Sequence, residues 1–94
     1  MSTKIDQRSL VVLLQHPLAE YRDVPAPARE VVIAGLTWVT DFWPSLAVSW
    51  IEQGVPLDQE LVDLLIEIGQ QSRWPQQLRH KAKALVRRWW REGR

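Results

Sequence analysis

The chain has 94 residues, a net charge of +1, no cysteine, and runs of apolar residues no longer than that of Leu10–Leu14. This length suits one domain, and the lack of cysteine excludes disulfides, thiol catalysis and zinc sites with Cys ligands. The apolar runs fall far short of the ~20 residues that a membrane span needs, and the polar first residues show no secretory signal. We therefore expect a soluble cytoplasmic protein with a single domain, residues 1–94.

Charge and tryptophan content are both uneven. Residues 73–94 carry eight basic side chains and one acid, a net charge of +7, whereas residues 1–72 carry a net charge of −6. Six tryptophans stand against one Phe and one Tyr. Such asymmetry indicates either an anionic partner or an acidic body that is neutralised by its own basic helix.

Apolar spacing and helix punctuation predict five helices, and no segment shows the alternation of a strand. Thr3–Asp6 has the form of a capping box, and Asp58 is the expected N-cap of the fourth helix. Ser72 is a candidate cap for the fifth helix, and Gly54 and Gly69 are expected to end the third and fourth. The predicted helices cover residues 4–15, 28–39, 45–53, 58–68 and 74–91.

The pairs Trp43-Pro44 and Trp74-Pro75 each open a predicted helix, and each follows a helix that ends a few positions earlier. Helix pairs that recur at intervals of about 30–45 residues are typical of HEAT-like stacked α-hairpins, although a proline in the first turn is common in any helical bundle. The expected fold is therefore all-α, a compact bundle of about five helices, and HEAT-like stacked α-hairpins are one possible form of it.

The C-terminal half contains Val55-Pro56, a helix over 60–67, Ile68-Gly69 and then Ala-Lys-Ala-Leu-Val-Arg-Arg-Trp at 82–89. This order resembles the N-terminal domain of eukaryotic transcription elongation factor IIS, whose last helix has the signature Ala-Lys-x-Leu-Val-x-x-Trp. Glu67 stands where that family has Thr. The resemblance covers about residues 55–91, and it implies a HEAT-like helical bundle that binds short peptides of transcription factors, has no catalytic activity and is nuclear.

Candidate site residues fall into two groups. An exposed tryptophan is a common anchor of protein interfaces, and we expect partner binding at Trp43, Trp50 and Trp90. At 100° per residue, one face of the last helix gathers four basic residues that could contact an anionic partner: Arg79, Lys83, Arg87 and Arg91. Arg and Lys near a helix C-terminus also favour its dipole, which explains part of this face without a ligand.

No arrangement of Ser, His and Asp suggests a nucleophile, and no glycine-rich loop suggests phosphate binding. The pair Asp63 and Glu67 has the form of an acid/base pair or a hard-metal site, but it is more simply a pair of surface acids that meet Arg residues of the last helix. We expect no catalytic activity, no cofactor and no metal.

Two functions follow. The first is a non-catalytic protein–protein interaction module, a small adaptor or regulator that could also associate with itself. The alternative is a nucleic-acid-binding accessory protein that uses the basic last helix. An exposed, unpaired basic face would favour the alternative, whereas pairing with acids at 52, 60, 63 and 67 would favour the first.

Overall fold

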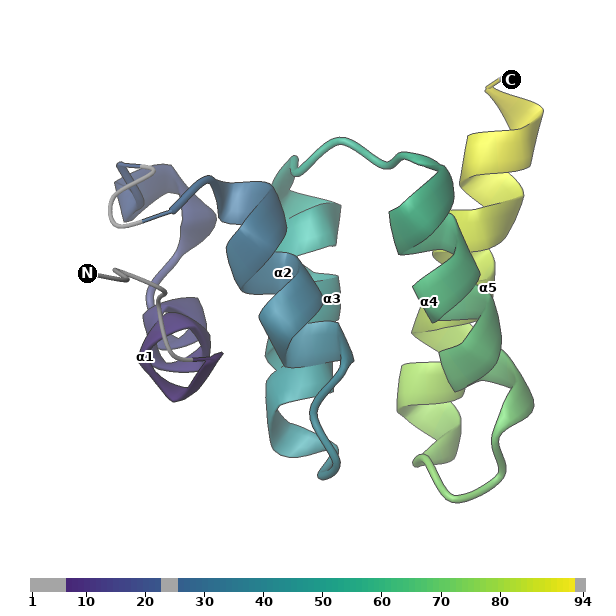
Figure 1. Ribbon diagram of the computed structural model, residues 1–94. Helices are drawn as coiled ribbons and strands as arrows, with labels where there is room; N and C mark the ends of the chain where they lie inside the picture. Colours follow the sequence, from purple (N-terminus) through teal and green to yellow (C-terminus); the bar gives the residue numbers. More distant parts are fainter. Residues whose placement is uncertain (1–6, 23–25, 93–94) are drawn as a thin grey trace.

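The computed structural model describes residues 7–22 and 26–92 (Figure 1). In chain order the elements are α1 (Gln7–Val11), the 3₁₀ turns η1 (Val12–Gln15) and η2 (Leu18–Glu20), α2 (Ala28–Leu36), α3 (Phe42–Gln53), α4 (Gln59–Gln70) and α5 (Gln76–Arg91). These two ranges contain no strand, so the all-α prediction is confirmed. The predicted capping box at Thr3–Asp6 lies outside the described residues.

Four of the helices form two consecutive hairpins, α2–α3 and α4–α5. The hairpins lie side by side, with α2 against α4 in one layer and α3 against α5 in the other, and α1 packs on the free side of α2 (Figure 1). Because α2 touches α1, α3 and α4, its apolar character on most faces is explained by neighbours on several sides.

The second hairpin repeats the first at the same interval that separates the two Trp-Pro pairs. A shift of that size places the start of α2 on the start of α4, and the N-cap Pro27 on the N-cap Asp58. It also matches buried positions, since Val31 and Ala34 of α2 correspond to Val62 and Leu65 of α4. The match does not extend to the second helix of each hairpin, because Trp43-Pro44 lies inside α3 whereas Trp74-Pro75 precedes α5.

Several helix ends differ by two or three residues from the predicted boundaries, and prolines account for two of these differences. Pro44 does not precede α3 but lies in its first turn, where a missing amide costs no hydrogen bond, so α3 begins at Phe42. Pro75, and not Ser72, occupies the N-cap position of α5, because the residue before a proline avoids the α region. Gly69 lies inside α4, which continues to Gln70.

The second helix ends at Leu36, earlier than its predicted end at Val39. The Thr37 hydroxyl donates to the carbonyl of Ile33 at 2.8 Å, and the β-branched residues that follow have low helix propensity. Val39, expected within the helix, is 73% exposed.

The core runs through both hairpins, with Trp50, Ile51, Leu61 and Leu65 at its centre. Trp50 is 1% exposed; its indole Nε1 donates to the carbonyl oxygen of His16 at 2.8 Å, and its ring lies 5.2 Å from that of Tyr21. This side chain therefore anchors the N-terminal segment to α3.

Helical periodicity predicts that Leu61, Leu64, Leu65, Leu85 and Trp89 are buried. Leu61, Leu65 and Leu85 are buried, whereas Leu64 and Trp89 are only half-buried. None of the described helices combines the length and the apolar character that crossing a membrane requires.

Candidate protein-binding groove

A groove of about 220 Å³ lies between α4 and α5. Its apolar floor consists of Leu65, Ile66, Gly69, Val86 and Trp90, and its polar rim of Gln70, Lys83 and Arg87. The Trp90 side chain is 61% exposed, which is unusual for the largest apolar residue type. The groove thus presents one aromatic ring and an aliphatic floor to the surroundings.

Gly69 allows α4 and α5 to approach closely under the groove. A Cβ atom at this glycine would lie 3.0 Å from Cγ of Lys83 and 3.8 Å from the carbonyl oxygen of Arg79. The aliphatic stem of Lys83 therefore lies against α4, and its ammonium group remains at the rim.

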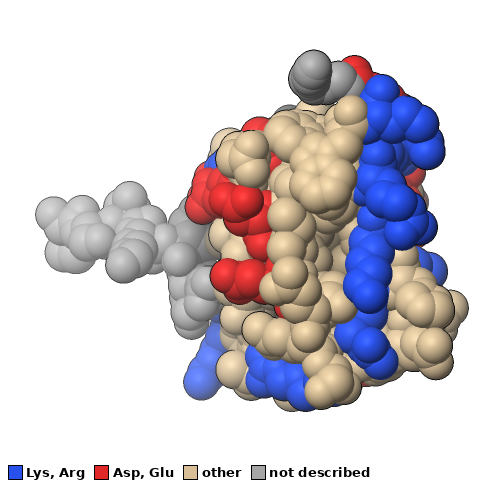
Figure 2. Space-filling model, turned by 90° about the vertical axis from the view of Figure 1, so that its right-hand side faces the viewer, with Lys and Arg blue, Asp and Glu red and all other residues tan. Residues whose placement is uncertain are grey.

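A basic column borders the groove along α5; it consists of Arg79, Lys83, Arg87 and Arg91. Lys83, Arg87 and Arg91 are exposed, whereas Arg79 is half-buried and its Nε donates to the carbonyl of Trp74 at 3.0 Å. Spacings of four residues place these side chains on one face, and Figure 2 shows a continuous line of Lys and Arg.

The expected pairing of this column with the acids at 52, 60, 63 and 67 does not occur. Within the described ranges no Asp or Glu lies within ion-pair distance of the column, and Glu60 pairs with Arg29 instead. Lys83, Arg87 and Arg91 are therefore free to meet an outside group, which is the condition that favours the nucleic-acid alternative.

An acidic wall, formed by Asp63 and Glu67, lies along α4. Both residues are exposed, and the side-chain amide of Gln59 donates to Asp63 at 2.9 Å. At 100° per residue they project beyond Ile66, on the side away from α5. Figure 2 shows the resulting order across the face: acidic side chains, an uncharged strip, and the line of basic ones.

The expected partner-binding pair Trp43 and Trp50 does not form. Although both lie on α3, Trp50 is under Tyr21 in the core, so the prediction of a surface role for it is wrong. Trp43 is half-buried and packs edge-to-face on Phe42, with ring centroids 4.7 Å apart. Of the three predicted tryptophans, only Trp90 is exposed in a groove.

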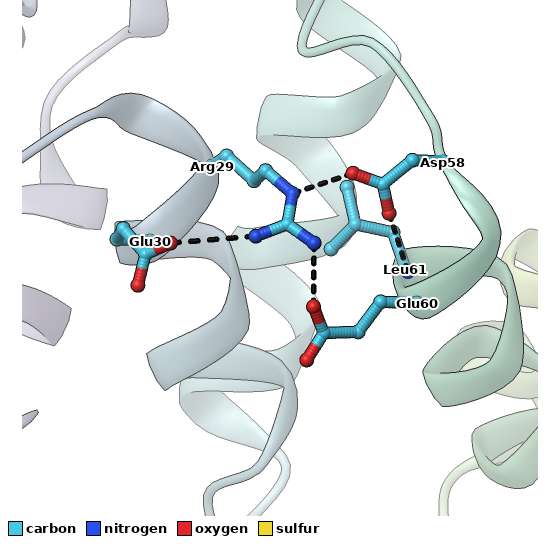
Figure 3. Close-up of polar contacts among 5 residues, drawn as sticks. All are labelled: Arg29, Glu30, Asp58, Glu60 and Leu61. Atoms are coloured by element: carbon cyan, nitrogen blue, oxygen red, sulfur yellow. Dashed lines mark hydrogen bonds and ion pairs between the residues drawn. The ribbon is translucent and has the colours of Figure 1, made fainter.

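A clamp that sequence reasoning missed joins α2 to the start of α4 (Figure 3). Arg29 of α2 binds Asp58 through Nε and Glu60 through Nη2, both at 2.5 Å, and Nη1 lies 3.3 Å from Glu30. The second oxygen of Asp58 accepts from the Leu61 amide at 3.0 Å, which confirms the predicted N-cap. The clamp therefore ties the first turn of α4 to the first hairpin.

Hydrogen bonding to Arg29 and to the Leu61 amide lowers the pKa of Asp58 below its ordinary value of 3.8. The two carboxylates raise the pKa of Arg29, which stays charged at any ordinary pH. The clamp is therefore a structural contact between α2 and the start of α4.

A second hollow, of about 450 Å³, lies where α3 and α5 end. It contains the half-buried Trp89 together with Glu52, Arg88 and Glu92, which carry charges of both signs. Over the described part of the chain, no group of three or more His, Asp or Glu is arranged to hold a metal ion. The paired acids of α4 thus have no third ligand of these types nearby.

Comparisons with protein-family models, with curated proteins and with solved structures gave no match. The likeness to the N-terminal domain of elongation factor IIS stays a prediction. Ala82, Leu85 and Val86 of its last-helix signature are all buried against the core, so helix packing by itself accounts for those positions.

Proposed function

We propose that this chain is a non-catalytic protein-interaction module whose binding surface is the groove between α4 and α5. The observation that carries the proposal is the exposed ring of Trp90 beside an apolar floor. Tryptophan is enriched among the residues that dominate binding energy at protein interfaces, especially where it is flanked by a pocket.

The size and the rim of the groove support a protein partner. A volume of about 220 Å³ is below the ~300–1,000 Å³ of sites that enclose small molecules, and it suits the insertion of a side chain from another protein. Charges of opposite sign on the two sides of the groove favour a partner that also carries both signs.

Site-specific cross-linking tests this proposal. A photo-reactive residue at the exposed position of Gln70 is expected to yield a cross-linked protein in cells of the source organism, and Trp90→Ala is expected to abolish the product. Trp90 is chosen because truncation of an interface tryptophan commonly costs more than ~2 kcal/mol of binding.

Phe42→Ala is the matched control, since Phe42 is also an exposed aromatic residue (53%) but lies outside the groove. Its cross-linking yield is expected to equal that of the unsubstituted chain. Equal loss in both variants, or no protein product at all from Gln70, would refute the groove as a protein-binding surface.

The second candidate function is nucleic-acid binding, and the unpaired basic column is the observation that favours it. Four cations in line along one helix match the repeating charge of a phosphate backbone. The acidic wall beside the groove opposes such a ligand by repulsion, which is why we place this function second.

A further inference from the structure

The arrangement of charges on the face formed by α4 and α5 indicates which kind of partner would bind there. The acidic wall, the groove and the basic column follow one another across the face, and the groove separates the two charges (Figure 2). A partner that matches this face must place cations against Asp63 and Glu67, anions against Lys83 and Arg87, and apolar groups between them.

We infer that the partner is a second copy of this chain, docked face to face about a two-fold axis parallel to α4 and α5. This inference rests on the proposed function, since it names the occupant of the same groove. A rotation about such an axis exchanges the two sides of the face, so the acidic wall of each copy meets the basic column of the other. An in-plane axis across the helices would set like charges against each other.

The same axis brings the two copies of Trp90 together. A rotation about an axis along the helices preserves height along them, and Trp90 lines the groove that the axis follows. The two exposed rings thus bury each other and the apolar floors beneath them. The four helices would form an antiparallel bundle, with α5 of one copy against α4 of the other, and the contact is self-complementary as a two-fold interface requires.

Net charge does not oppose this association. The whole chain carries only +1, so two copies repel each other weakly at long range, although each has strongly charged regions. An acidic peptide in the groove would leave the acidic wall without a counterpart, and a nucleic acid would be repelled by it. A second copy satisfies both charged sides at once.

Charge reversal and complementation test the inference by sedimentation or light scattering. We expect the unsubstituted chain to be a dimer, and the variants Asp63→Lys/Glu67→Lys and Lys83→Glu/Arg87→Glu each to be monomeric, because each sets like charges together on both sides. An equimolar mixture of these two variants is expected to regain the mass of a dimer. In the unsubstituted chain the dissociation constant is expected to rise with salt concentration.

The control variants carry equal charge changes outside the groove: Glu20→Lys/Glu52→Lys and Arg22→Glu/Lys81→Glu. Both are expected to remain dimeric, and circular dichroism checks that every variant keeps its helices. Trp90→Ala gives a second disruption without a change of charge, and it is expected to yield a monomer.

Three results would overturn the inference. The first is a monomer at about 1 mM protein, a concentration that populates any dimer with a dissociation constant below about 1 mM. The others are dissociation in the control variants but not in the groove variants, and a mixture of the groove variants that stays monomeric. Failure of the proposed function looks different. A monomeric chain whose Gln70 still cross-links to another protein loses the dimer but keeps the groove as a protein-binding surface.

Discussion

Two glycines in helices of different hairpins show how single atoms control packing. A Cβ at Gly35 would lie 2.6 Å from Cδ1 of Leu14 and 2.9 Å from Cβ of Ala47, which are both buried. The one tight contact of a Cβ at Gly69 would be the stem of Lys83 at 3.0 Å, whose exposed side chain is able to turn aside. The neighbours of Gly35 are therefore fixed in the core, whereas the neighbour of Gly69 is a flexible surface side chain.

Alanine at these glycines is therefore expected to have opposite consequences for stability. Gly35→Ala should lower the free energy of unfolding by about 1–3 kcal/mol, since overpacking exceeds the gain of ~1 kcal/mol in helix propensity. Gly69→Ala should leave stability unchanged or slightly raised, because that gain offsets the shift of Lys83. Urea unfolding measures both, and equal effects at the two sites would contradict this account.

The tryptophans show where single-residue reasoning from sequence ends. Trp50 and Trp90 both lie in predicted helices and have polar residues near them in the sequence. Trp50 is nevertheless 1% exposed and Trp90 61% exposed. The difference arises from Tyr21 and the His16 carbonyl, which cover Trp50 from a segment that is distant in the sequence. The local spacing of residues does not predict such a long-range contact, whereas the burial of Leu61 and Leu65 follows directly from helical periodicity.

At the scale of the helix, the carboxylate of Asp58 makes two structural contacts. One oxygen caps α4 and the other binds Arg29 of α2. Asp58→Asn is expected to retain the cap, because Asn is as good an N-cap as Asp, but to lose the ion pair. Asp58→Ala is expected to lose both, at a further cost of about 1 kcal/mol.

This ion pair predicts a pH dependence with a definite sign. The pKa of Asp58 is lowered in the folded state, so its contribution to stability is complete above pH 3.8 and is lost as the pH falls through the folded value. Between about pH 5 and 2, the unfolding free energy of Asp58→Asn is expected to decline less steeply than that of the unsubstituted chain. Parallel curves from urea titrations would show that the pair contributes nothing.

Helices were predictable because capping and periodicity are local, and the ends that were wrong involve Thr37, Pro44 and Pro75, where several boundary positions satisfy the same local rules. The spacing of the Trp-Pro pairs matches the interval between the starts of α2 and α4, but the pairs themselves lie at different positions relative to α3 and α5. The link between Arg29 and Asp58 was not predictable, since it depends on how the hairpins stack and not on either helix alone.

At the scale of the whole molecule, no acidic residue among those described forms an ion pair with the basic last helix. The sequence showed that the last helix is basic, and its helical spacing placed Lys83 and Arg87 on one face, where both line the rim of the groove. The sequence left open whether the acidic residues of α4 would form ion pairs with that basic face. In the fold, Asp63 and Glu67 lie beyond the groove instead of on the basic column, so both charges face outward.

Nucleic-acid titration separates the two functions that this surface admits. If the basic column binds duplex phosphate, replacing Arg79, Lys83, Arg87 and Arg91 with Gln should weaken binding and reduce the log–log salt slope by about 0.9 for each phosphate that is no longer neutralised. Trp90→Ala would then weaken single-strand binding by about 1–3 kcal/mol, as expected for a stacked base.

Under the protein-interaction function, fluorescence anisotropy at two salt concentrations should show only weak binding by the unsubstituted chain, with a dissociation constant no tighter than the ~10⁻⁴–10⁻⁶ M of non-specific contacts. The acidic wall is the physical reason, because a strand laid along Lys83 and Arg87 passes close to Asp63 and Glu67 on the other side of the groove. The variant Asp63→Asn/Glu67→Gln removes that repulsion, so it is expected to bind nucleic acid more tightly than the unsubstituted chain. Tight, salt-sensitive binding by the unsubstituted chain would reverse the order of the two functions.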